Sequence, residues 1–284
     1  MVQIKIAVDI GGTKTEVALI SKGKIKKIVK YKTPHIKKKF CEELIRHIKE
    51  KSDGKNISGI GVSVAGPVYQ GKVLNCPHLP IKNFNLKKFL VSKLKKKVEV
   101  ENDANCFALA ELKKGYGKDY RNFVLIAIGT GIGGGIVIDK KLYVGKGAAG
   151  EIGHMIIGDK GKDNWGIKGA FEGLASGDAL VKLSKKITGQ KYLAYELSGM
   201  ASKGDKKAKK VIDEISYHLG RGFVSISNLL NPDAIILAGG VVECGPKLLG
   251  EAKKQLKKYV SISPDIKLSK INKGALIGAA ELVK

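Results

Sequence analysis

The feature that most limits the possible folds is a glycine-rich turn set between two apolar runs in Phe123–Ile138 (FVLIAIGTGIGGGIVI). Six apolar residues come first, five glycines then fall within the seven positions 129–135, and a second apolar run follows. This pattern predicts a strand, a tight turn and a second strand. Glycine reaches positive φ freely and has no Cβ, so such a turn can bring consecutive backbone N–H groups against an anion. The stretch therefore predicts a phosphate-binding hairpin, with a ligand-free glycine hairpin as the alternative.

Gly129, Gly131 and Gly134 also fit the GxGxxG spacing of dinucleotide-binding folds. In those folds the motif opens a helix whose N-terminus faces the pyrophosphate. Here a strand follows the glycines, so we interpret the match as coincidental. The chain has no GxxxxGK[ST] sequence either, which argues against a Walker phosphate loop.

A second turn of the same kind lies near the beginning of the chain, in 4–20 (IKIAVDIGGTKTEVALI). Asp9 lies near the end of an apolar strand, and Gly11 and Gly12 form the turn before an alternating strand. The two glycine turns are about 120 residues apart, too far for a solenoid, whose period is roughly 20 to 50 residues. We therefore expect a duplicated architecture in which each half offers one glycine hairpin to the same phosphate chain.

Polar residues end another predicted strand. The alternating run Val98–Glu101 leads to Asn102 and Asp103, just before a helix predicted from about Ala104 to Lys114. In α/β folds, chemistry is commonly placed at the carboxyl ends of strands. Asp103 is therefore a candidate catalytic carboxylate, and the alternative is that it only caps the helix.

The second half of the chain adds a small-residue loop, Gly145–His154 (GKGAAGEIGH), which carries Glu151 and His154. A lone histidine of this kind is more often structural than functional. One helix is predicted over about 170–185, and the apolar run Ala234–Ala238 predicts a buried strand. Since strands and helices alternate throughout the chain, the predicted class is α/β.

The length of 284 residues suits two domains of ordinary size. We place them at 1–116 and 117–271, and 272–284 could pack back on the first. No uncharged run is long enough to span a bilayer, and no signal-peptide core follows Met1, so we expect a cytoplasmic protein without membrane contact. The four cysteines are scattered without a CxxC pair, which indicates reduced thiols.

The net charge of +26 invites a nucleic-acid interpretation, because lysine-rich surfaces gain from counterion release. Only three arginines are present, however, and base or phosphate recognition favours arginine. The lysines fall on the expected outer faces of helices. We interpret the charge as a solvated cationic surface and predict no specific nucleic-acid partner.

Taken together, these motifs resemble the ROK sugar kinases, a family of the actin-like ATPase superfamily. The similar segments are, in order, the first phosphate motif Asp9–Lys14, the catalytic motif Asn102–Asn105, the second phosphate motif Gly129–Gly134, the sugar motif Gly150–His154 and the adenosine motif Gly239–Gly240. The resemblance extends over essentially the whole chain.

The resemblance implies two actin-like, ribonuclease H-like domains around a central cleft, with ATP, Mg²⁺ and a sugar as ligands. It implies that Asp103 is the general base and that Asp9 holds Mg²⁺ through water. The residues implied to bind the sugar are Gly66, His78, Asn102, Asp103, Glu151, His154 and Glu172. Those implied to bind the nucleotide are Asp9, Gly11, Gly12, Thr13, Lys14, Gly129, Thr130, Gly131, Gly133, Gly134, Gly239 and Gly240.

The chain departs from the family where a Cys-x-Cys-Gly-x-x-Gly-Cys zinc motif is common. Asp163, Trp165 and Ala170 stand at the three cysteine positions, and these side chains cannot form a tetrahedral thiolate site. We therefore predict no structural zinc, a loop held by packing of Trp165, and a His154 that serves the sugar alone.

The substrate implied by the resemblance is a hexose, first of all glucose phosphorylated at the 6-hydroxyl. His78 stands where the family usually has asparagine, which leaves N-acetylmannosamine, another N-acetylhexosamine or fructose as alternatives. A non-catalytic sugar-binding regulator is the alternative of another class. Repressors of this family carry an amino-terminal helix-turn-helix, for which we expect no room before Ile4. A homodimer or homotetramer is expected from the family.

Overall fold

The computed structural model describes residues 3–283, and this part of the chain divides into two compact units. The first unit contains the chain up to Lys118, the segment Lys141–Ala149 and the chain from Ile271 onward. The second contains Asp119–Lys140 and Gly150–Lys270. We propose that the two units are the two domains expected from the sequence, with boundaries shifted by one or two residues and with the 141–149 segment lying in the first unit.

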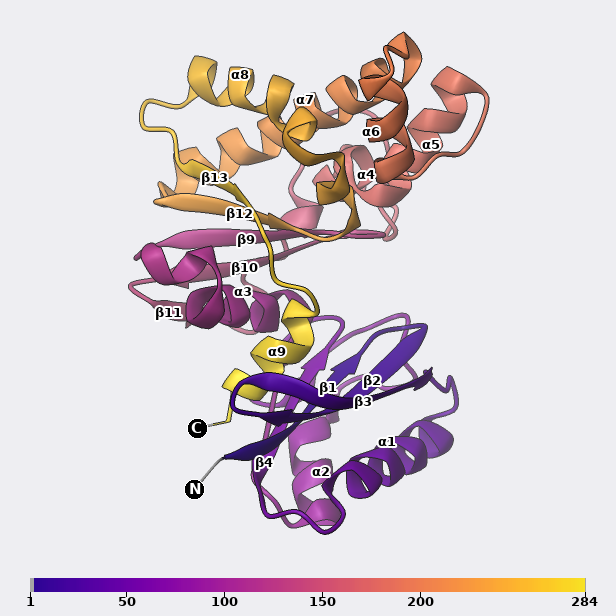
Figure 1. Ribbon diagram of the computed structural model, residues 1–284, viewed down its shortest axis with the longest axis vertical. Helices are drawn as coiled ribbons and strands as arrows, with labels where there is room; N and C mark the ends of the chain where they lie inside the picture. The colour runs from indigo at the N-terminus through magenta and orange to yellow at the C-terminus, as the bar shows by residue number, and fades with distance from the viewer. Residues whose placement is uncertain (1–2, 284) are drawn as a thin grey trace. The chain divides into compact units, whose positions relative to one another are not determined.

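The first unit is built on a five-stranded sheet in the order β3-β2-β1-β4-β8 (Figure 1). Its strands are β1 (Ile4–Ile10), β2 (Lys14–Ser21), β3 (Lys24–Lys32), β4 (Ile57–Val64) and β8 (Val98–Asn102). β2 runs antiparallel to β1 and β3, whereas β4 runs parallel to β1 and β8. The short strands β5 (Val68–Tyr69), β6 (Lys72–Val73) and β7 (Phe84–Asn85) form a second sheet.

Helices cover both faces of the first sheet. They are α1 (Lys37–Ser52), α2 (Leu86–Leu94), α3 (Asp103–Lys114) and α9 (Gly274–Glu281). The first unit also contains the strand β11 (Lys141–Tyr143), and the 3-10 turn η1 (Tyr116–Asp119) lies where the chain passes into the second unit. Because side chains alternate along a strand, Ile6 and Val8 of β1 pack with α1 and α2, while Ala7 packs with α3 and α9. The chain end thus returns to the first unit, and α9 lies beside β1 in Figure 1.

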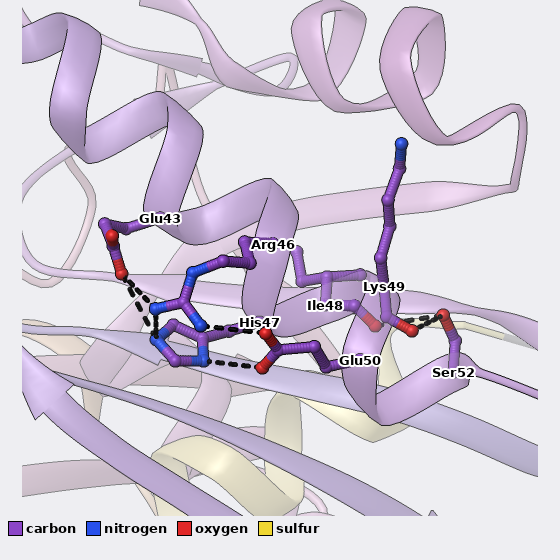
Figure 2. Close-up of polar contacts among 7 residues, drawn as sticks. All are labelled: Glu43, Arg46, His47, Ile48, Lys49, Glu50 and Ser52. Atoms are coloured by element: carbon purple, nitrogen blue, oxygen red, sulfur yellow. Dashed lines mark hydrogen bonds and ion pairs between the residues drawn. The ribbon is translucent and has the colours of Figure 1, made fainter.

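The outer side of α1 carries a small ion-pair network (Figure 2). Arg46 contacts Glu43 at 2.5 Å and Glu50 at 2.8 Å, and the ring of His47 stacks on Tyr31 at a centroid distance of 4.1 Å. Exposed pairs three and four residues apart give a helix only a small stabilisation, because water screens their charges. The network therefore supports α1 but contains none of the residues implied to bind ligands.

The second unit has its own sheet, in which the strands follow the order β10-β9-β12-β13. The strands are β9 (Phe123–Ile128), β10 (Ile132–Ile138), β12 (Ala234–Ala238) and β13 (Asp265–Leu268). The helices are α4 (Phe171–Ala175), α5 (Gly177–Thr188), α6 (Ala194–Ser202), α7 (Lys206–Leu230) and α8 (Gly250–Tyr259), with the 3-10 segments η2 (Ile152–His154) and η3 (Gly240–Leu249).

The long helix α7 supplies much of the core of the second unit. Val211, Ile215, Leu219, Phe223 and Ile226 lie on one face, and each is at most 1% exposed. Side chains spaced three or four residues apart share one face of a helix, so α7 turns this face to the core. Within residues 3–283, no helix is both long enough and apolar enough to cross a membrane.

The single helix predicted over about 170–185 is wrong, because the chain forms two helices there, α4 and α5. Ser176 lies between them with extended backbone (φ −74°, ψ 173°), and its side chain accepts a hydrogen bond from the N–H of Ala179 at 3.2 Å. A serine cap of this kind begins a new helix. The break also turns the N–H of Gly177 toward the carbonyl oxygen of Gly129, 2.8 Å away.

Asp205 caps α7, since its Oδ1 accepts hydrogen bonds from the N–H groups of Lys207 (2.8 Å) and Ala208 (3.0 Å). Asp205→Ala leaves these donors without a partner and is expected to lower the free energy of unfolding by about 1 kcal/mol. Asp205→Asn keeps an acceptor oxygen, so its free energy of unfolding should fall by only a small part of that amount. Urea unfolding measures both variants, and equal losses would contradict the cap.

Candidate functional site

The first glycine turn joins β1 to β2. The N–H of Gly11 donates to the carbonyl oxygen of Lys14 at 2.9 Å, and the Thr33 hydroxyl donates to the carbonyl oxygen of Gly11 at 2.7 Å. A Cβ placed on Gly12 would lie 2.6 Å from Cβ of His78. The turn is therefore in direct contact with the segment that carries His78. Its conformation is held by its own backbone hydrogen bond and by Thr33, the residue after β3.

The second glycine turn joins β9 to β10 and is braced by a carboxylate. Oε2 of Glu172 accepts a hydrogen bond from the N–H of Ile132 at 2.9 Å, and a Cβ on Gly131 would lie 2.2 Å from the same oxygen. The φ angles of Gly129 and Gly131 lie outside the left-handed range. The sequence-based reason for these glycines is therefore wrong in part: Gly131 is required for space and not for positive φ.

Asp9 lies near the end of β1, beside other charged groups of the first unit. The Ser63 hydroxyl donates to Oδ1 of Asp9 at 2.7 Å, and Nζ of Lys273 contacts Oε2 of the buried Glu16 at 2.8 Å. Burial raises the pKa of Asp9 above its ordinary value, and the charge of Glu16 raises it further, against the opposing effects of Ser63, Lys14 and Lys273.

This environment fits a hard divalent cation. A carboxylate whose ionised form is disfavoured gains from a nearby positive charge, and oxygen ligands are those that Mg²⁺ prefers. No cluster of three or more His, Cys, Asp or Glu side chains able to hold a metal occurs within 3–283. A Mg²⁺ ion near Asp9 would therefore depend on water and phosphate oxygens for most of its ligands.

Asn102 and Asp103 lie where β8 passes into α3. Asn102 is the helix cap: its Oδ1 accepts from the N–H of Asn105 at 3.1 Å, and its Nδ2 donates to the carbonyl oxygen of Gly66 at 3.1 Å. Asp103 is the first residue of α3, and its Oδ1 accepts from the N–H of Ala104 at 2.8 Å. The alternative that Asp103 itself is the cap is therefore wrong.

Burial and nearby carboxylates raise the pKa values of two buried thiols. Burial raises the pKa of Cys76, and the charge of Asp103 raises it further. Burial also raises the pKa of Cys106 well above its ordinary value, with further contributions from Glu101, Asp9 and Asp103. Asp9 and Asp103, widely separated in the sequence, therefore both raise the pKa of the same buried thiol in the first unit.

Glu151, His154 and Glu172 come together in the second unit. Nε2 of His154 lies 3.8 Å from Oε2 of Glu151, and the two side chains are 29% and 39% exposed. Burial raises the pKa of Glu151; His154 lowers it and the charge of Glu172 raises it. Since all three remain reachable, the cluster can offer two carboxylates and an imidazole to a ligand with several hydroxyl groups.

The loop after this cluster is not held as we expected from the sequence. Trp165 is 51% exposed, so packing of its side chain into the core does not hold the loop. The side chain of Asp163 is fully buried instead, and its Oδ1 accepts from the N–H groups of Trp165 (2.9 Å) and Ile167 (2.8 Å). Oδ2 of Asp163 lies 2.8 Å from Nδ1 of His154, so His154 is not free for a sugar alone.

A cavity of about 470 Å³ lies next to the second glycine turn. It is lined by Gly129, Thr130, Gly177, Asp178, Leu180, Val181, Leu193, Ala194, Tyr195, Gly240, Val241 and Glu243. Cavities of this size and mixed lining are typical of small-ligand sites. Gly239, at the end of β12, has φ +93°, and a Cβ there would lie 2.4 Å from the carbonyl oxygen of Ile128.

The sequence predicted that Gly129 and Gly240 of this cavity bind a ligand, but it did not predict the apolar residues that line the cavity. Leu193 and Tyr195 are 53% and 55% exposed, and both follow α5, far along the chain from the glycine motifs. No local pattern marked them. A larger cavity of about 750 Å³ elsewhere in the second unit, lined in part by Tyr217, Arg221 and Tyr259, contains none of the predicted site residues, so size alone does not identify the site.

The two α/β units and their glycine turns define an α/β protein of the actin-like class, as the sequence predicted. The ROK family profile matches residues 5–284. A glucokinase from Halalkalibacterium halodurans is 32% identical over 316 residues, covering 98% of this chain and 94% of the relative. The chain therefore belongs to the ROK family.

Two further relatives show what the family contains. The crystal structure of a ROK family glucokinase from Streptomyces griseus in complex with glucose and AMPPNP has a TM-score of 0.85 and 28% identity, and covers 99% of each chain. The xylose repressor of Bacillus spizizenii is 31% identical over 80% of this chain and 60% of its own length. The chain is thus similar to kinases over their whole length and to a repressor over part of it.

The environment of Asp9 predicts a variant that is more stable than the natural protein. A raised pKa means that the native protein binds the Asp9 proton more tightly than the unfolded chain does, so stability falls as pH rises through the ordinary value of 3.8. Asp9→Asn removes the charge but keeps an acceptor for Ser63. We expect its Tm at pH ~7 without ligands to rise by a few degrees.

Differential scanning calorimetry with and without Mg·ATP measures this effect, and Asp53→Asn, at an exposed carboxylate, is the matched control. Nucleotide should add less stability to Asp9→Asn than to the natural protein. A lower Tm for Asp9→Asn in the absence of ligands would show that Asp9 is not an electrostatically unfavourable carboxylate.

Proposed function

We propose that the protein is an ATP-dependent sugar kinase that phosphorylates a hexose, with glucose at the 6-hydroxyl as the first substrate to consider. Full-length similarity to glucokinases supports this proposal. The observation that carries it is the placement of Glu172. This carboxylate braces the second glycine turn through Ile132 and also neighbours Glu151, so the turn suited to phosphates and the cluster suited to hydroxyl groups share one side chain.

The residues of the second unit would bind both ligands. We propose that the cavity beside Gly129 and Gly240 takes the adenosine and that the backbone of Gly129–Gly134 faces the phosphates. Leu193 and Tyr195 would contact the base. Carboxylates and an imidazole form directional hydrogen bonds with a polyol, and a site of that kind rejects analogues that lack the matching hydroxyl.

The residues of the first unit would supply the proton acceptor. Phosphoryl transfer depends mostly on positioning and charge stabilisation, and Mg²⁺ held near Asp9 would neutralise phosphate charge when bound. Asp103 would accept the proton of the attacking hydroxyl. Asn102 and Gly66 already bond to each other, so we propose that they fix the start of α3 and with it the position of Asp103.

The choice of sugar depends in part on His78. His78 contacts the first glycine turn through Gly12, and its ring is exposed. N-acetylmannosamine, another N-acetylhexosamine and fructose remain the alternative substrates. A homodimer or homotetramer stays an expectation taken from the family, and a cytoplasmic location stays one taken from the sequence.

The activity is tested by coupling ADP release to a spectrophotometric assay with Mg·ATP and a panel of hexoses and N-acetylhexosamines. We expect glucose to give the highest kcat/KM. Calorimetric titration of glucose is run in parallel. A protein that binds sugars but releases no ADP with any of them would be a sugar-binding regulator, and the kinase proposal would be wrong.

The role of Asp103 makes a second prediction. Asp103→Asn keeps the size of the side chain and an oxygen for the N–H of Ala104, but cannot accept a proton. Its kcat is expected to fall by about 10²- to 10⁴-fold. The KM for the sugar should change little, and so should the Tm. Initial-rate kinetics measure kcat and KM. A kcat equal to that of the natural protein would exclude Asp103 as the base.

A further inference from the structure

Asp163 makes more hydrogen bonds than its place in an exposed loop would suggest. Its side chain is fully buried although Asn164 and Trp165 beside it are exposed. One carboxylate oxygen accepts from the backbone N–H groups of Trp165 and Ile167, and the other faces Nδ1 of His154 at 2.8 Å. A buried carboxylate is costly unless it is fully hydrogen-bonded, and this one is.

The bond between Asp163 and His154 fixes where the imidazole carries its proton. An ionised carboxylate can only accept hydrogen bonds, so the contact requires a proton on Nδ1 of His154. Burial alone raises the pKa of Asp163, but the bonds from His154 and from the Ile167 and Trp165 backbone outweigh it and hold the pKa below its ordinary value. The neutral ring therefore presents Nε2 without a proton.

The orientation of the His154 ring is restricted from a second side. The ring of Trp165 meets it edge to face, with centroids 5.5 Å apart and planes at 75°. The exposed Trp165 ring thus packs against the His154 imidazole and not into the core. With Nδ1 bonded to Asp163 and one edge against Trp165, Nε2 lies on the side of Glu151, 3.8 Å from its Oε2.

We propose that Asp163 is a positioning residue for sugar binding: it holds His154 in the Nδ1–H form, so that Nε2 accepts a hydrogen bond from a sugar hydroxyl. This inference rests on the proposed sugar kinase activity. It assigns to one buried aspartate two tasks, ordering of the loop through Trp165 and Ile167 and selection of the imidazole tautomer. Glu172, whose Oε1 accepts from the N–H of Asn164 at 3.3 Å, links the same loop to the second glycine turn.

Asp163→Asn separates the two tasks. The amide oxygen can still accept from the N–H groups of Trp165 and Ile167, so the loop should keep its conformation. The amide nitrogen then faces Nδ1 of His154 and can only donate. The imidazole must therefore move its proton to Nε2, which turns the ligand-facing nitrogen from an acceptor into a donor.

The tautomer is measured directly by ¹⁵N NMR of protein labelled at histidine, in which a protonated ring nitrogen and a bare one have well separated shifts. The chain has five histidines, and the signals of His154 are identified by their loss in His154→Gln. Spectra are recorded near pH ~8.5, about two units above the ordinary histidine pKa. We expect Nδ1–H in the natural protein and Nε2–H in Asp163→Asn.

Steady-state kinetics then test whether the tautomer of His154 affects sugar binding. Asp163→Asn is expected to raise the KM for the sugar about tenfold, which is the effect of one mismatched hydrogen bond, while the KM for ATP and the Tm change little. Asp159→Asn is the matched control, because it removes an exposed carboxylate from the same segment. It should leave both the tautomer and the two KM values unchanged.

An Nε2–H form in the natural protein would overturn the proposal even if the variant failed to fold. So would a shift of tautomer with no change in the KM for the sugar, or an equal rise in both KM values with a lower Tm, which would indicate a purely structural aspartate. Failure of the kinase proposal is distinguishable, because the natural protein would then show no sugar-dependent ADP release whatever the tautomer of His154.

Discussion

The proposed chemistry depends on how α3 begins. Asn102 caps the helix with its amide oxygen and holds the carbonyl oxygen of Gly66 with its amide nitrogen, and Oε1 of Glu101 accepts from both the backbone N–H of Asn102 and Nδ2 of Asn105. These bonds tie the ends of β4 and β8 to the first turn of α3. Asp103 is thereby presented at a fixed place, and a base whose position varied by an ångström would lose much of its effect.

The second unit uses a comparable arrangement around Glu172. This carboxylate accepts from the turn that follows β9 and from the loop that contains Asp163, while its charge is felt by Glu151. Gly131 leaves the space for it. A ligand that contacts Glu172 therefore also contacts, through one side chain, the backbone expected to face the phosphates.

The sequence predicted those parts of the fold that depend on local patterns. Both glycine hairpins and the strand before Asn102 followed from periodicity and turn residues. The break at Ser176 was not predicted, although serine is a common helix cap; its extended backbone places the N–H of Gly177 against the carbonyl oxygen of Gly129, which is distant in sequence.

For the candidate site, the glycines and the polar residues could be named from motifs, but their surroundings could not. Leu193 and Tyr195 reach the cavity only through the packing of the second unit. Asp163 was visible only as the residue at a cysteine position, and its burial and its bond to His154 depend on the folded loop. Sequence motifs thus located the candidate chemistry, while the contacts that hold it in place required the structure.

The most direct test of the account is a crystal structure of the protein with glucose and a non-hydrolysable ATP analogue. The account predicts a carboxylate oxygen of Asp103 within about 2.6–3.2 Å of the 6-hydroxyl and the adenosine in the cavity beside Gly129 and Gly240. A sugar with no hydroxyl within reach of Asp103, or an adenosine bound away from that cavity, would contradict it.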